Sequence, residues 1–180
     1  MVFKFFRSGK NGGRSQAVVP VQSASSVEPE PPRLEQLGPV LWQDVRYGMA
    51  LSEIRELHPV SVSTTEGHAL GDGTTAPLEI PLFRLADRDF RVLFYCRGGR
   101  VTQITIATLG EPSMDEFRKL TGALRLRYGA EVEMSEDPHG FSHAEWLSAE
   151  GSNISLVCSP AIGCLNIVFQ NHYSDAARKL

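Results

Sequence analysis

Apolar residues recur at the helical period in one short segment of the chain. Leu51, Ile54 and Leu57 follow one another at intervals of three residues, which places them on one face of a helix. Pro59 disfavours helical backbone at His58, so the helix is barely two turns long. The segment predicts a short amphipathic helix with one core-facing side.

A second and longer helix is predicted between Ser113 and Gly129. Ser113 and Glu116 have the spacing of a capping box, in which each side chain satisfies a free backbone N–H of the first turn. Gly129 supplies the C-terminal stop. The apolar stripe of this helix consists of Phe117, Leu120, Leu124 and Tyr128.

Strand-like segments follow each predicted helix. They cover residues 78–85, 89–96 and 101–109 after the first helix, and 144–149, 153–158 and 164–170 after the second. The order is therefore helix, strand, strand, strand, twice over. We expect an α+β fold in which two tandem helix-plus-three-strand repeats form an antiparallel sheet covered by helices on one face. The repeats span about residues 40–109 and 112–170.

The last predicted hairpin has a register that the apolar pattern selects. A four-residue loop from Pro160 to Gly163 brings together two sets of core-facing residues. These sets are Ile154, Leu156 and Cys158 on one strand and Leu165, Ile167 and Phe169 on the other. Cys158 then points inward and Cys164 outward, which argues against a disulfide between them.

The middle hairpin of the first half allows two loops. A three-residue loop, 97–99, with Gly99 in a left-handed conformation sets three apolar residues against the next strand. The pairs are Phe90 with Ile106, Val92 with Ile104 and Phe94 with Thr102. A two-residue loop at Gly98 and Gly99 places Phe94 opposite Gln103, so the apolar residues of the two strands do not share one face. The three-residue loop is therefore predicted.

A short motif begins at the step from Gly48 to Met49. It continues with a short helix that contains Glu53 and ends with a hairpin whose aromatic residues precede a Gly-Gly pair. This motif resembles the helix-then-strands module of the BamE and beta-lactamase-inhibitor-like superfamily. In that family a Ser or Thr cap follows the Gly-Met step, whereas Ala50 stands here. The resemblance covers about residues 40–109, with a degenerate second copy at 112–170. It implies a fold that is used to hold other proteins.

The chain divides near residue 36. Residues 8–36 are rich in Ser, Gly, Pro and charge and show no apolar period, so they cannot bury enough surface to offset the entropy of ordering them. We expect a disordered tail at 1–36, a folded domain at 37–173 and a C-terminal tail at 174–180.

The first ten residues combine aromatic and basic side chains. No acid occurs before Glu28, so the start of the chain is locally cationic. Such a segment is typical of a weak anchor on anionic lipid. The candidate membrane-surface contacts are Phe3, Lys4, Phe5, Phe6, Arg7 and Lys10. The alternative is an unstructured start whose aromatic rings do nothing or fold back onto the domain.

Charge and composition exclude several classes of function. The formal net charge of -3 gives no general attraction to nucleic acid. No apolar run approaches the length of a membrane-spanning helix, and the charged start does not form a secretory signal. The three cysteines lack metal or redox spacing and are typical of reduced thiols. We expect a cytoplasmic protein, with a peripheral location at the inner membrane surface if the tail binds lipid.

Catalytic patterns are weak. Four side chains between residues 136 and 145 have ligand chemistry, namely Asp137, His139, His143 and Glu145. Pro138 and Gly140 prevent the helix that would align two histidines, and no Glu stands between them as in a metalloprotease motif. The glycines at 71–73 and 98–99 fit turns, and Cys96 fits a structural thiol. No catalytic, cofactor-binding or metal-binding residue is therefore expected.

Two functions from different classes remain. The first is a non-enzymatic interaction or scaffold domain that holds a protein partner on its outer sheet face or at the loop around Gly71. The second is a small-ligand- or metal-dependent enzyme that uses the 136–145 loop. The sequence favours the first and names no partner.

Overall fold

The computed structural model describes residues 37–65, 67–137 and 140–171. The helices are α1 (Leu51–Leu57), α2 (Met114–Tyr128) and a 3-10 turn, η2 (Pro160–Ile162). The first strands are β1 (Val40–Trp42), β2 (Val45–Arg46), β3 (Val62–Ser63), β4 (Thr75–Leu85), β5 (Arg88–Arg97) and β6 (Arg100–Thr108). The others are β7 (Glu133–Ser135), β8 (Ser142–Leu147), β9 (Ser152–Ser159) and β10 (Cys164–Asn171). None of the described helices has the length and apolar character needed to cross a bilayer.

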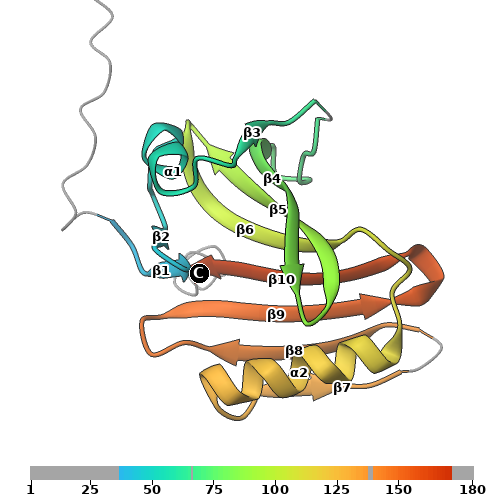
Figure 1. Ribbon diagram of the computed structural model, residues 1–180. Helices are drawn as coiled ribbons and strands as arrows, with labels where there is room; N and C mark the ends of the chain where they lie inside the picture. The colour runs from blue at the N-terminus through green and yellow to red at the C-terminus, as the bar shows by residue number, and fades with distance from the viewer. Residues whose placement is uncertain (1–36, 66, 138–139, 172–180) are drawn as a thin grey trace, which may run out of the picture. The chain divides into compact units, whose positions relative to one another are not determined.

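Eight of these strands form one antiparallel sheet, in the order β3-β4-β5-β6-β10-β9-β8-β7. The first and second halves of the chain meet where β6 pairs with β10. β1 and β2 form a separate two-stranded hairpin. The α+β class is confirmed. α2 packs on β9 and β8. Figure 1 shows α1 at the other end of the sheet, near β5.

The core lies on one face of the sheet. Ile54 of α1 and Phe117 of α2 are fully buried and belong to one continuous apolar cluster with the inward residues of the strands. Trp146 and Trp42 belong to the same cluster, as their size and apolar character predict. Both helices therefore cover the same face.

The predicted helices and long strands are present, with boundaries that differ by up to three residues. Leu57 differs from its prediction, because its side chain is 42% exposed although it shares the helical spacing of Ile54. The short strands were not predicted, since two or three residues cannot show a period. These unpredicted strands are β1, β2, β3 and β7.

The register of the β9–β10 hairpin is as predicted. Leu165 pairs with Cys158 and Phe169 with Ile154, around the loop at residues 160–163. Gly163 closes this loop in the left-handed conformation (φ 66°). Cys158 is fully buried and all three cysteines are free thiols.

The predicted register of the β5–β6 hairpin is wrong. The loop has two residues, Gly98 and Gly99, both with positive φ, and Phe94 pairs with Ile104. A bulge makes this possible, because Thr102 is an extra residue in β6 between the partners of Cys96 and Tyr95. The bulge returns the apolar residues of β6 to the inner face, so the two-residue loop costs no core contact.

Several predictions fall outside the described residues. They are the N-terminal tail at 1–36 with its six candidate membrane contacts, His139, and the C-terminal tail at 174–180. These remain predictions from the sequence.

Candidate functional site

The second face of the sheet carries no helix of the described part of the chain. The outward side chains of four neighbouring strands, β6, β10, β9 and β8, form what we call the open face. β6 and β10 contribute Gln103, Thr105, Ala107, Asn166, Val168 and Gln170, and β9 and β8 contribute Asn153, Ser155, Val157, His143, Glu145 and Leu147. Most of these residues are half-buried by their neighbours, and Leu147 is exposed.

The pairing aligns the open face into straight rows across the strands. One row runs from Thr105 through Val168 and Ser155 to Glu145, each residue directly opposite the next. The centre of the face is uncharged and combines amides, hydroxyls and valines. Such a surface offers hydrogen bonds and apolar contact together, which is the composition of many protein interfaces.

The loop around Gly71 packs on the outer side of the sheet beside the β6 edge of the open face. Leu70 of this loop packs on a small second cluster of Ala76, Leu93 and Tyr95, on the outer side of β4 and β5. The loop is fixed locally, because Asp72 accepts a hydrogen bond from the Thr74 N–H and forms an ion pair with Arg97. The residues at 71–73 are a turn, as predicted.

Acidic side chains mark the opposite margin. Glu133 of β7 stands directly opposite Glu145 of β8, and like charges in this position repel. His143 Nε2 lies 3.0 Å from a Glu145 carboxylate oxygen. The ring of the exposed Phe141 stacks on that of His143. This margin is therefore acidic and carries one exposed aromatic ring.

The predicted 136–145 loop does not gather its four candidate ligands among the described residues. His143 and Glu145 lie together on the open face, while His139 is outside the described chain. The backbone of Asp137 is tied to Ser142, whose hydroxyl accepts from the Asp137 N–H and donates to the Asp137 carbonyl. No group of three His, Cys, Asp or Glu side chains within the described ranges is arranged to hold a metal ion.

The thiols lie in apolar surroundings. Burial raises the pKa of the Cys96 thiol to about 12. Burial also raises the pKa of Cys158 and of Cys164. A reactive cysteine requires a lowered pKa, so the geometry gives none of these thiols the character of a nucleophile.

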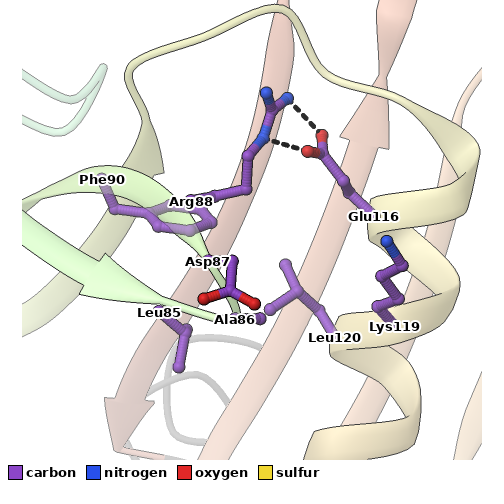
Figure 2. A pocket seen from close by; sticks show the side chains of 8 residues that line it. All are labelled: Leu85, Ala86, Asp87, Arg88, Phe90, Glu116, Lys119 and Leu120. Carbon is purple, nitrogen blue, oxygen red and sulfur yellow. Dashed lines mark hydrogen bonds and ion pairs between the residues drawn. The ribbon is translucent and has the colours of Figure 1, made fainter.

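One cavity lies between the β4–β5 turn and α2, as Figure 2 shows. It has a volume of about 150 Å³. Apolar side chains form its floor and charged ones its walls and mouth. The floor consists of Leu85, Phe90 and Leu120, and the charged residues are Asp87, Arg88, Glu116 and Lys119.

An ion pair forms one wall of this cavity. The Arg88 guanidinium binds both carboxylate oxygens of Glu116, with Arg88 Nη2 2.6 Å from Oε2, and donates a further bond to the Glu111 carbonyl. Glu116 was predicted to complete a capping box with Ser113. Ser113 does accept the Glu116 N–H at 3.3 Å, but the Glu116 carboxylate reaches across to Arg88 instead. The pair fixes the hairpin of the first half on the helix of the second.

The turn beside the cavity has an unusual backbone. Ala86 and Asp87 both have positive φ, 49° and 63°, which a two-residue hairpin turn of this type requires. Asn and Gly are the common residues in such turns. Ala86 therefore keeps a strained conformation that a glycine would relieve.

The cavity residues were missed by the sequence analysis. Leu85, Phe90 and Leu120 have the pattern of ordinary core positions, and Arg88 is far from Glu116 in sequence. The Leu-Ala-Asp-Arg turn between two strands is the one local signal, and it predicts a hairpin rather than a site. Only the packing of the hairpin on α2 creates the cavity.

Comparison of the chain with protein-family models, with curated proteins and with solved structures gives no significant match.

Proposed function

We propose that this chain is a non-enzymatic protein-interaction domain that binds its partner on the open face. The observation that carries the proposal is the one-sided sheet. Both described helices pack on one face, and β6, β10, β9 and β8 present their other face without such a cover. An uncovered face with valines and amides in register across four strands offers an extended row of contacts, which suits a protein surface better than a small molecule.

The chemistry of the face defines the partner. Val157 and Val168 at the centre require apolar side chains opposite them, and Glu133 with Glu145 at the margin requires a basic one. The partner is a protein segment with Lys or Arg beside apolar residues. A basic partner residue would also remove the repulsion between the two glutamates, which is a gain in binding free energy.

The sheet order supports a duplicated origin for this surface. Each half has a helix, then a short edge strand, β3 or β7, and then three long strands. The two halves run in mirrored order from the β6–β10 pair outward. We infer tandem repeats of the kind found in the BamE and beta-lactamase-inhibitor-like proteins, in agreement with the short motif around Gly48 and Met49.

The N-terminal segment gives the proposed domain a location. Phe3, Lys4, Phe5, Phe6, Arg7 and Lys10 are proposed to contact the anionic inner surface of the membrane weakly. The domain would then act in the cytoplasm as an adaptor, free or at the membrane surface. No nucleic acid is proposed as a ligand.

An affinity purification with the full chain tests the interaction. Val157→Lys with Val168→Lys places two cations at the centre of the open face and should abolish retention of a specific partner. Leu126→Lys is the matched control, since Leu126 is 93% exposed on α2 and lies outside the open face. Unfolding midpoints close to wild type show that the variants are folded. Equal retention by both variants contradicts the proposal.

Two further measurements separate the competing functions. Sedimentation of the purified chain alone detects a second copy of the chain as the partner. Metal analysis of the same sample tests the metal-dependent form of the enzyme that would use the 136–145 loop, because that form requires stoichiometric bound metal.

A further inference from the structure

We propose that the cavity between the β4–β5 turn and α2 binds a small zwitterion with a branched apolar side chain, an α-amino acid of the size of leucine. This site is separate from the open face, so the inference goes beyond the proposed protein-interaction function and does not depend on it.

The floor of the cavity selects an apolar group. Phe90 and Leu120 are almost fully buried, at 1% and 2% exposure, and Leu85 is half-buried beside them. The pocket of about 150 Å³ is open to solvent, with an apolar floor below a charged mouth, and a small branched apolar group fits its volume. A branched four-carbon side chain is such a group, and it would gain dispersion contacts with Phe90 and Leu120.

The charged residues at the mouth of the cavity determine which charges a ligand must carry. Asp87 on the turn and Lys119 on α2 carry opposite charges, as Figure 2 shows, and both are exposed. Neither forms an ion pair with another described residue, whereas Arg88 and Glu116 neutralise each other. One anion and one cation therefore remain for a ligand.

The two charges and the floor together fit an α-amino acid. Its ammonium group would bind the Asp87 carboxylate, its carboxylate the Lys119 ammonium group, and its side chain would lie between Phe90 and Leu120. A net charge of zero at the mouth disfavours phosphates and divalent cations. Because both charged partners are exposed, we expect millimolar affinity.

Titration of the full chain with L-leucine, followed by amide NMR shifts, tests the site. We expect saturable shifts centred on the turn at 85–88 and on residues 116–120. Glycine, which lacks the side chain, should produce no such shifts. Deleting one charge of the ligand, as in 4-methylpentanoate or 3-methylbutylamine, should weaken binding about two- to fivefold. Absence of saturable shifts with L-leucine, or equal binding of glycine, overturns the proposal.

Two variants assign the charges. Asp87→Asn removes the anion and keeps a residue that tolerates positive φ, and Lys119→Gln removes the cation on the exposed side of α2. Asp87→Asn should weaken L-leucine about two- to fivefold and leave 4-methylpentanoate unchanged, because that ligand has no ammonium group. Lys119→Gln should weaken both. Arg118→Gln, on the same helix, is the control and should change neither. Unchanged affinity for L-leucine in both site variants overturns the assignment.

Discussion

The burial of each cysteine side chain depends on the face of the sheet to which it points. Cys96 and Cys158 point into the core, and Cys164 lies at the start of β10 with partial exposure. The strand alternation that predicts the directions of Cys158 and Cys164 is visible in the sequence, because apolar residues occupy every second position of β9 and β10.

The first prediction concerns alkaline stability. An ionised thiolate is disfavoured at the buried Cys96 site, where the pKa is raised to about 12 from its usual 9.0. Between these values the unfolded chain loses the thiol proton and the folded chain keeps it, so the free energy of unfolding falls as pH rises. One such group contributes up to about 1.4 kcal/mol per pH unit. Denaturant unfolding of Cys96→Ala should show a smaller decline above pH 9 than wild type. Parallel declines in both proteins would contradict this.

The second prediction concerns thiol access. Cys164 should react with a thiol reagent in the native protein, although slowly because its pKa is raised by burial. Cys158 should react only after unfolding, since its side chain has no exposed surface. Mass spectrometry of peptides labelled before and after denaturation distinguishes the two. Equal native labelling would show that the β9–β10 hairpin opens as a unit.

At the scale of elements, the helices and long strands could be predicted because each contains enough residues to show its period. The β5–β6 register could not, because the bulge at Thr102 has no signature in the sequence. The Gly-Gly loop alone sets one register and the bulge corrects it. The candidate cavity was equally invisible, since it depends on packing between the β4–β5 turn and α2. Local pattern specifies elements, and long-range packing specifies sites.

The start of α1 provides a test of local chemistry. Ala50 has the extended backbone of an N-cap but no side-chain acceptor for the Glu53 N–H, while the Glu53 carboxylate accepts the Ala50 N–H at 2.7 Å. Ala50→Thr should complete the capping box and raise the free energy of unfolding by about 1 kcal/mol. Ala50→Val has the same shape without the hydroxyl and is the control. If Thr and Val give equal stability in denaturant unfolding, the missing cap does not limit this helix.

At the scale of the whole molecule, the described domain and the N-terminal segment have opposite electrostatic character. The first 27 residues contain four basic residues and no acid, although the complete chain has a net charge of -3. A basic segment attached to an acidic domain suits an anionic bilayer, because the segment is attracted while the domain is repelled.

Vesicle sedimentation tests this arrangement. We expect each of Lys4, Arg7, Lys10 and Arg14 to contribute about 1 kcal/mol near an anionic surface, and the phenylalanine rings to insert at the interface. The full chain should therefore sediment with phosphatidylserine-containing vesicles at low salt and dissociate as salt rises, because the Debye length shortens. Replacement of all three rings, Phe3, Phe5 and Phe6, by Ser should abolish binding even at low salt, since charge alone leaves no apolar anchor. Uncharged phosphatidylcholine vesicles provide the control surface. A wild-type chain that stays in the supernatant with anionic vesicles at low salt has no membrane role, and the adaptor function then depends on the open face alone.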